Sequence, residues 1–366
     1  MYPIRILHVF GRVDRGGAET MVMNLYRNID RSLIQFDFAV HTNDICDYEE
    51  EIIGLGGKIY RFPQFNGINI MKYIKSWRKF LKKHQEYKII HGHMYSIASI
   101  YLFIAKRYGI YTIAHSHNTS NGKSIKSTIK DMFCFPLKYI CDYKMACGLD
   151  AAKWLFGENV IKENSFHLLK NSINLEDYLF KSEIDERVSN KGRIIVCGHI
   201  GRFVEVKNHR FLIDVFFEYH KLNPNSILLL IGTGELEDVI KEYVIKLRIE
   251  KVVFFLGLQK NVKEYLSKMD VFIFPSVYEG LPLALVEAQA SGIQCFISNT
   301  ISDEVCITSC INKLSLKEPA SVWARCIKEK NLMKKNTYSE LRNAGYDIAN
   351  TVQWLSKFYI NHYKLR

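Results

Sequence analysis

Short runs of β-branched, aliphatic and aromatic residues recur along this chain, and most are followed by a stretch with helical periodicity. In residues 70–84, for example, apolar side chains recur at helical spacing on one face, and lysines occupy the other. Buried strands that alternate with such helices predict parallel sheets in an α/β protein. The predicted strands are residues 5–10, 36–41, 58–62, 88–91, 111–114, 166–169, 193–200, 226–231, 252–257 and 271–274.

The most informative stretch is VFIFPSVYEGLPLALVEAQASG, residues 271–292. It predicts a buried strand, a loop and then a helix that begins near Pro282 and ends with a left-handed cap at Gly292. The free amides at the start of that helix make a site for an anion. Glu279 in the loop and Glu287 on the helix both border this site, although two carboxylates at this spacing are also common as a solvated pair.

A double glycine follows the first predicted strand, in the sequence GRVDRGGAET. Gly16 and Gly17 permit a close approach of the backbone to a ligand, although a plain turn gives the same pattern. The dinucleotide fingerprint G-x-G-x-x-G is absent, which disfavours a nicotinamide-dependent dehydrogenase.

Histidines stand at the ends of two predicted strands, His91 and His93 after one and His115 and His117 after another. The carboxyl ends of parallel strands border the crevice where ligands bind. A metal cluster is one interpretation, but neither a helical H-x-x-x-H pair nor a nearby carboxylate supports it, so no metal site is predicted.

In the second half, Gly201 and Arg202 follow a strand, and Lys207 and Asn208 come five residues later. These cations are either solvated or form a clamp for a diphosphate, in which arginine offers a forked set of donors and lysine a point charge. The later G-T-G-E, after residues 226–231, is interpreted as a turn.

Four motifs occur in the same order as in one known family: G-G-A-E, the strand-end histidine, G-R-x(4)-K-N and E-x(7)-E. The chain resembles the retaining nucleotide-sugar glycosyltransferases of the sucrose-synthase-like family, glycosyl transferases group 1. This resemblance implies the GT-B fold, an α/β architecture of two doubly wound Rossmann-like domains that face each other across a cleft. The domains are expected at residues 1–172 and 173–345, with a helix at about 346–366 that packs back on the first. In the hinge, Ser172 stands where the family has glycine.

The resemblance also implies roles for individual residues. Arg202 and Lys207 would hold the diphosphate, Glu279 would position the sugar, and Glu287 would bind the ribose. His117, preferred over His115, would contact the sugar or line the acceptor side. The nucleotide-sugar-binding residues implied are Gly16, Gly17, Arg202, Lys207, Leu258, Glu279, Gly280, Leu281, Leu283 and Glu287, and the catalytic ones are His117, Arg202, Lys207 and Glu279.

The predicted activity is retaining transfer of a sugar from a nucleoside diphosphate, with UDP favoured as the carrier, to an acceptor hydroxyl. The favoured acceptor is a lipid-linked saccharide in the assembly of a bacterial envelope, capsular or exopolysaccharide. No cofactor is expected, and the absence of an Asp-x-Asp triplet predicts catalysis without a metal. The alternative is a non-catalytic protein of the same fold that binds a nucleotide-sugar or carbohydrate.

Charge then indicates a partner. The net charge is +12, and residues 1–170 hold 24 basic against 15 acidic side chains, whereas the remainder holds 26 against 23. Without a zinc-finger spacing or an RNP-like strand, an anionic membrane surface is favoured over nucleic acid. The stretches 70–84 and 123–140, the second with Phe133 and Phe135, are the candidate contacts.

The predicted location is cytoplasmic and peripheral on the inner face of the membrane. No apolar run reaches the roughly 18 residues that span a bilayer, and the first residues are interpreted as a strand rather than a signal peptide. The nine cysteines include no C-x-x-C pair, so reduced thiols are expected.

Overall fold

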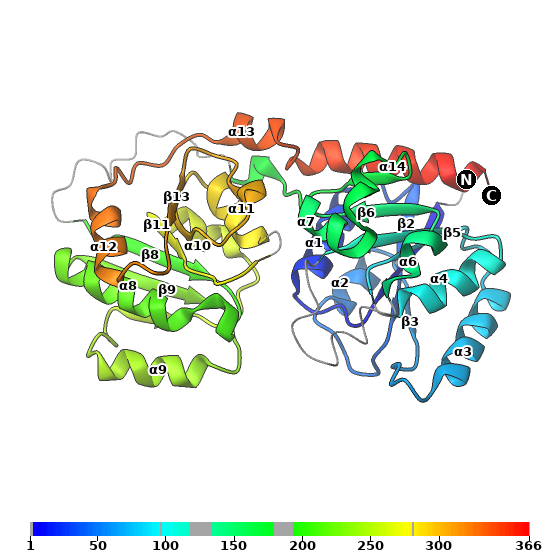
Figure 1. Ribbon diagram of the computed structural model, residues 1–366, viewed down its shortest axis with the longest axis horizontal. Coiled ribbons are helices and arrows are strands. Elements are labelled where there is room, and N and C mark those ends of the chain that lie inside the picture. Colours follow the sequence, from blue (N-terminus) through cyan, green and yellow to red (C-terminus); the bar gives the residue numbers. More distant parts are fainter. Residues whose placement is uncertain (1–2, 96, 118–133, 179–192, 280–281, 366) are drawn as a thin grey trace. The chain divides into compact units, whose positions relative to one another are not determined.

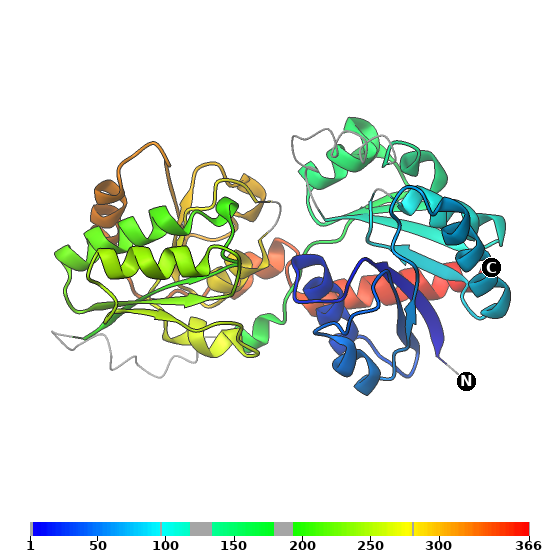
Figure 2. The same cartoon turned by 90° about the horizontal axis from the view of Figure 1, so that it is seen from below.

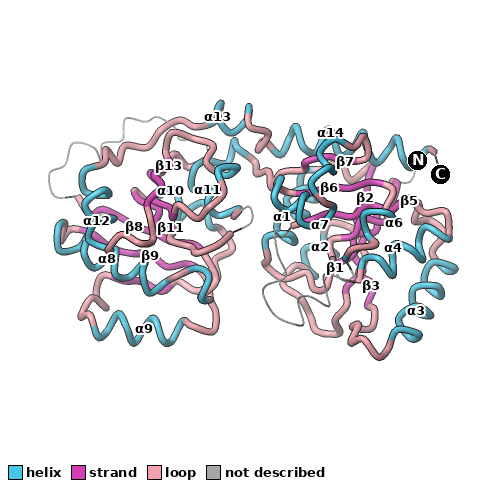
Figure 3. The backbone as a smooth tube through the Cα atoms, viewed as in Figure 1, coloured by secondary structure: helices cyan, strands magenta, loops and turns pink. Residues whose placement is uncertain are grey.

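The computed structural model describes residues 3–95, 97–117, 134–178, 193–279 and 282–365. The chain divides into two compact units: unit 1 is residues 1–173 with 347–366, and unit 2 is residues 174–346. In Figure 1, unit 1 has the blue to cyan-green segments and the red C-terminal helix, and unit 2 runs from green to orange. Each unit is a parallel α/β sheet flanked by helices (Figure 3).

Unit 1 is built on a sheet with the strand order β3-β2-β1-β4-β5-β6-β7, all pairs parallel. The order changes direction between β1 and β4, so the loops after these two strands diverge and leave room for a ligand. The strands are β1 (Ile4–Phe10), β2 (Ile34–Val40), β3 (Ile59–Arg61), β4 (Ile89–Gly92), β5 (Tyr111–Ser116), β6 (Tyr143–Ala146) and β7 (Phe166–Leu168).

The helices of unit 1 bury their apolar faces against this sheet. Helix α3 buries Tyr73, Trp77 and Leu81, as its periodicity predicts, and leaves its basic face exposed. The C-terminal helix α14 packs in unit 1, where it contacts α1 and lies alongside the sheet (Figure 2). The helical segments are α1 (Gly17–Asn28), α2 (Glu49–Gly54), α3 (Ile70–Lys83), α4 (Ala98–Arg107), α6 (Leu137–Ile140), α7 (Leu149–Phe156), η1 (Glu158–Lys162) and α14 (Ile348–Lys364).

Unit 2 has the strand order β10-β9-β8-β11-β12-β13, again all parallel, and its order changes direction between β8 and β11. The strands are β8 (Ile195–Ile200), β9 (Ser226–Ile231), β10 (Val253–Phe255), β11 (Val271–Phe274), β12 (Gln294–Ser298) and β13 (Ile311–Leu314). The helical segments are η2 (Leu175–Tyr178), η4 (Glu205–Lys207), α8 (His209–Leu222), α9 (Glu237–Lys246), α10 (Val262–Lys268), α11 (Leu283–Ala290), η5 (Asp303–Val305), α12 (Ala320–Glu329) and α13 (Tyr338–Asn343).

The predicted fold class, two parallel-sheet Rossmann-like domains, is confirmed. The ten predicted strands all exist, with ends shifted by up to two residues. Strands β6, β12 and β13 were not predicted, and Lys144 and Lys313 interrupt the apolar pattern of β6 and β13. Gly292 has the left-handed φ of 69° expected of a helix cap, and a Cβ there would lie 2.1 Å from the carbonyl oxygen of Lys335.

All nine cysteines are free thiols, and seven of them are buried. Among the described residues, no helix combines the length and the apolar character needed to cross a bilayer.

Candidate active site

In unit 2 the predicted cationic residues lie where the strand order changes direction. Lys207 ends the 3-10 turn η4 in the loop after β8, and Glu279 lies in the loop after β11, the neighbouring strand. The Nζ of Lys207 is 2.5 Å from Oε1 of Glu279, and the two side chains are only 18% and 13% exposed. Lys207 Nζ also lies 5.1 Å from the centre of the Phe274 ring, a cation–π contact. The structure therefore joins two motifs that are 72 residues apart in the sequence.

The two loops are tied together by their backbones. The amide of Val277 donates to the carbonyl of Val206 at 2.8 Å. Asn208 has a left-handed φ of 54°, which asparagine tolerates better than most residues, and its side-chain amide donates to the carbonyl of Pro275 at 3.3 Å. These bonds fix Lys207 relative to the loop that carries Glu279.

Two glycines hold the loop of Arg202 against the next loop, and sequence reasoning missed this role. A Cβ on Gly232, whose φ is 135°, would lie 2.1 Å from the carbonyl oxygen of Gly201. A Cβ on Gly234 would lie 2.5 Å from the carbonyl oxygen of Phe203. The G-T-G-E turn is thus a close approach of two strand-end loops, and Arg202 is exposed beside it.

Glu287 lies on α11 and accepts a hydrogen bond from the hydroxyl of Tyr178 at 3.0 Å. Burial raises the pKa of Glu287 to about 7, and the bond from Tyr178 offsets part of this shift. Burial, and then the nearby Glu287, raise the pKa of the Tyr178 hydroxyl. Tyr178 was not predicted, since a tyrosine 109 residues away carries no local signal of this contact.

The remaining predicted donor-site residues are placed as follows. Leu258 is 58% exposed in the loop after β10, next to Gly257 with its φ of 63°. Leu283 is the first residue of α11. Gly280 and Leu281 lie outside the described residues.

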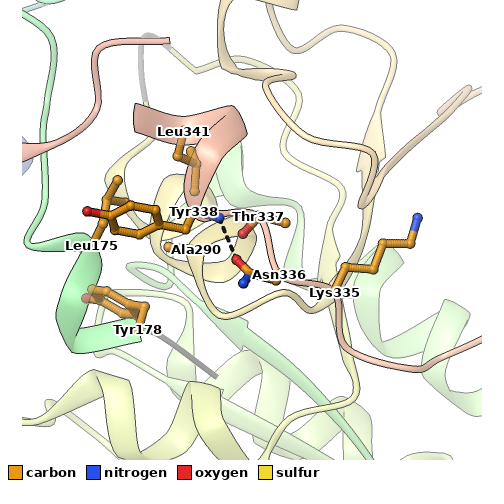
Figure 4. Close-up of a pocket in the computed structure, with 8 residues that line it drawn as sticks. All are labelled: Leu175, Tyr178, Ala290, Lys335, Asn336, Thr337, Tyr338 and Leu341. Atoms are coloured by element: carbon orange, nitrogen blue, oxygen red, sulfur yellow. Dashed lines mark hydrogen bonds between the residues drawn. The ribbon is translucent and has the colours of Figure 1, made fainter. Parts of the chain in front are cut away.

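A small pocket is lined in part by Tyr178, and Figure 4 shows its lining. Helix α13 and the segment before it contribute most of the wall, and Ala290 at the end of α11 contributes the rest with the η2 turn. Arg202, Lys207 and Glu279 do not line it. The lining residues are Leu175, Tyr178, Ala290, Lys335, Asn336, Thr337, Tyr338 and Leu341.

In unit 1 the double glycine lies in the loop after β1. Gly16 precedes α1 and Gly17 is its first residue. A Cβ on Gly16 would lie 2.3 Å from a carboxylate oxygen of Glu19, whereas one on Gly17 would meet nothing within 4 Å. No contact among the described residues therefore explains why position 17 is glycine. The space beside Gly17 is open and could hold a ligand.

The strand-end histidines form one continuous cluster, and His8 of β1 belongs to it. Nδ1 of His8 is 2.9 Å from Nε2 of His93, and Nδ1 of His93 is 2.8 Å from Nε2 of His117. Nδ1 of His91 is 2.6 Å from the hydroxyl of Tyr359 on α14. The ring centroids of His115 and His117 are 4.1 Å apart, and the rings are tilted by 30°. His8 was missed because nothing local in the sequence indicates that β1 pairs with β4.

Burial keeps these rings neutral. It lowers the pKa of His117 to about 3, and burial together with neighbouring histidines lowers the pKa of His93 and His115 well below the usual range. His117 is partly exposed, whereas His115 is buried. The accessible histidine is thus the one that the sequence analysis preferred, although its role stays a prediction.

Two family models match this chain. Glycosyltransferase Family 4 matches residues 15–176, and Glycosyl transferases group 1 matches residues 180–345. These two matches and the two Rossmann-like units define a glycosyltransferase with the GT-B fold. The chain belongs to the GT-B glycosyltransferases.

The most informative relative bears the name of a glycosyltransferase, EpsF of Bacillus subtilis (strain 168). It is 36% identical to this chain over 97% of this chain and 96% of its own length. A UDP-Gal:alpha-D-GlcNAc-diphosphoundecaprenol alpha-1,3-galactosyltransferase of Escherichia coli is 26% identical over 80% of both chains. Among solved structures, HepE of Anabaena in complex with UDP has a TM-score of 0.77 at 15% identity, over 98% of this chain and 100% of its own, and so shares the fold.

Proposed function

We propose that this glycosyltransferase moves a sugar from a nucleoside diphosphate, preferably UDP, to a hydroxyl of a lipid-linked saccharide with retention of configuration. The observation that carries the proposal is the pair of Lys207 and Glu279 at the point where the strand order of unit 2 changes direction. A partly buried cation at such a point suits a diphosphate. In this proposal residues 173–345 bind the nucleotide-sugar and residues 1–172 serve the acceptor.

The leaving diphosphate gains negative charge as its bond to the sugar breaks. Lys207, the exposed Arg202 and the free amides at the start of α11 are the groups proposed to stabilise that charge. Such fixed electrostatic stabilisation is usually the largest single contribution to catalysis, and these groups supply it without a metal.

The two glutamates then have separate roles. Glu287 accepts hydrogen bonds from the ribose hydroxyls, and such bonds to a charged group contribute about 1.5–3 kcal/mol each. Its Oε1 is held by Tyr178 in this structure, so the ribose either uses Oε2 or displaces the tyrosine. Glu279 releases Lys207 to the diphosphate and binds hydroxyls of the sugar ring.

Retention is proposed to follow from attack on the face that the diphosphate leaves, without a protein nucleophile. The bond from the anomeric carbon to the diphosphate oxygen breaks, the bond to the acceptor oxygen forms, and the acceptor proton passes to the departing phosphate. His117 of unit 1 contacts the sugar or lines the acceptor side. Because this mechanism uses no protein nucleophile, Glu279 and Glu287 are not assigned as the acid and nucleophile pair of a glycosidase.

A lipid-linked acceptor is supported by the name of the Escherichia coli relative, whose acceptor is carried on diphosphoundecaprenol. It is also supported by α3, whose Lys72, Lys75, Arg78, Lys79, Lys82 and Lys83 are all exposed. None of these six side chains forms an ion pair with a described residue. Ile68, just before this helix, and Met71, in its first turn, are also exposed. Such a face suits the anionic inner leaflet of a membrane.

The test is a screen of nucleoside diphosphate sugars with a prenyl-diphosphate-linked saccharide, read as release of nucleoside diphosphate. UDP release that requires the acceptor is expected, and NMR of the new linkage should show the anomeric configuration of the donor. An inverted product would contradict the retaining mechanism. Tight binding of a donor without any release would favour the non-catalytic binding protein.

A further inference from the structure

The histidine cluster of unit 1 contains buried ring nitrogens that no described residue satisfies. Both nitrogens of His115 lack a hydrogen-bond partner among the described residues, although the ring is only 1% exposed. Nδ1 of His117 is also buried and has no hydrogen-bond partner among the described residues. Buried polar atoms are rarely left unpaired, and each such atom costs about 1–3 kcal/mol. Each neutral ring carries one N–H, so His115 has one nitrogen whose lone pair no described residue satisfies.

We propose that His93, His115 and His117 bind one transition-metal ion of the class that prefers imidazole nitrogen, with Zn²⁺ as the best match. One ligand atom from each ring lies within 4.8 Å of the others. A tetrahedral zinc ion, with Zn–N distances of about 2.0–2.1 Å, needs ligand nitrogens about 3.4 Å apart. The ring nitrogens must therefore move closer together when the ion binds, and three histidines with an open fourth position form a known kind of zinc site.

The ligand type is the one that this class of ion prefers, because imidazole nitrogen suits zinc and related transition metals. His117 is the one partly exposed member of this trio, although its Nδ1 is buried.

A second trio, His8, His91 and His93, also has ligand atoms close together. It is a poorer site, since all three residues are buried, whereas the first trio includes the partly exposed His117. His93 belongs to both trios, so only one ion is expected. The proposal departs from the prediction of no metal, which rested on the absence of both a helical histidine pair and a nearby carboxylate.

Metal binding at these residues has one consequence that rests on the proposed function. A bound ion would hold His117, which is proposed to face the substrate, so saturating zinc should slow the transfer reaction. The binding itself does not depend on that role, and the experiment measures binding first.

The test is titration of the full chain, stripped with a chelator, with Co²⁺ as a spectroscopic substitute for zinc. One equivalent should give visible d–d bands without the near-ultraviolet charge-transfer band of a cobalt thiolate, which excludes the nine cysteines. One equivalent of Zn²⁺ should displace the cobalt. Absence of stoichiometric binding, or a thiolate band in its place, would overturn the proposal.

Variants assign the ligands. His115→Leu replaces an unpaired buried ring by an apolar side chain, so the metal-free protein should keep its melting temperature, and cobalt affinity should fall by more than about a hundredfold. His117→Ala provides a second ligand deletion if the first variant folds poorly. The matched control is His209→Leu, because His209 is also buried with both ring nitrogens unpaired among the described residues but belongs to no trio. Wild-type affinity in His115→Leu, or loss only in His8→Leu, would refute the assignment.

Discussion

The ammonium group of Lys207 is 2.5 Å from Oε1 of Glu279. The positive charge that is proposed to bind the diphosphate is therefore balanced by a carboxylate before any donor binds. A diphosphate must compete with this carboxylate for Lys207. The pair therefore links donor affinity to catalysis, and its two members should respond to substitution in opposite ways.

Removal of the cations should abolish most of the activity. Lys207→Ala and Arg202→Ala should each lower turnover by at least about a hundredfold, because each removes a donor to the charge that develops in the transition state. Steady-state release of nucleoside diphosphate measures this. Lys241→Ala is the control, since Lys241 is a lysine of the same unit whose partners are Glu237 and Asp238 on its own helix. Near wild-type rates in both folded variants would remove these residues from the mechanism.

Substitution of Glu279 should separate affinity from turnover. In Glu279→Gln the charge that competes for Lys207 is lost, so affinity for free UDP should rise by up to about tenfold, or about 1.4 kcal/mol. Turnover should fall, because the contact to the sugar hydroxyls is weakened. Calorimetry with UDP and a transfer assay measure the two effects. A parallel loss of both would show that Glu279 only maintains the structure of the loop.

Glu287 should control donor affinity and its dependence on pH. Glu287→Ala should weaken nucleoside diphosphate binding by roughly ten- to a hundredfold, or about 1.4–2.8 kcal/mol. The raised pKa, about 7, means that the carboxyl group is protonated below this pH and ionised above it. The ribose hydroxyls donate to the ionised form, so affinity should fall as pH drops below about 7.

Glu287→Gln is the matched control for this pH effect, because the diphosphate itself also titrates near neutrality. Calorimetry at several pH values should show a steeper fall in affinity below pH 7 for the wild type than for the variant. If the wild type and Glu287→Gln have identical pH profiles, and Glu287→Ala keeps the wild-type affinity, Glu287 does not bind the nucleotide.

Transfer should not depend on a divalent metal at the phosphates. The sequence has no Asp-x-Asp, and Lys207, Arg202 and the start of α11 are the groups proposed to supply the positive charge. A chelator should therefore change the transfer rate by less than about twofold. If zinc bound at the histidines slows the enzyme, the chelator should raise the rate. Activity that is abolished by chelator and restored by Mn²⁺ or Mg²⁺ would favour the metal-dependent class.

The basic face of α3 should bind anionic membranes. Each basic residue near such a surface contributes about 1 kcal/mol, and the Debye length falls to about 3 Å at 1 M salt. The protein should sediment with anionic vesicles at low salt, be released at high salt and ignore neutral vesicles. Reversal of Lys79, Lys82 and Lys83 to glutamate should abolish sedimentation.

The control reverses three exposed lysines of unit 2, Lys246, Lys251 and Lys260, and should sediment as the wild type does. A further variant at Lys123, Lys126 and Lys130, which lie outside the described residues, tests the second predicted stretch. If the wild type ignores anionic vesicles at low salt, a soluble acceptor becomes the better proposal.

The sequence by itself determined the elements and the motifs. Periodicity placed the buried and basic faces of α3, and the run 271–274 with Pro282 and Gly292 marked β11 and α11, because local pattern reflects which side chains a strand or helix buries. The family resemblance predicted Lys207, Glu279, Glu287 and His117 as site residues.

Only the tertiary structure decided which of these residues meet. Lys207 pairs with Glu279 because β8 lies beside β11, and His8 joins His93 because β1 lies beside β4. Tyr178 reaches Glu287 from a turn far away in the sequence. Strand order is set by the packing of helices across the whole sheet, and the spacing of apolar residues within one strand carries no information about its neighbour.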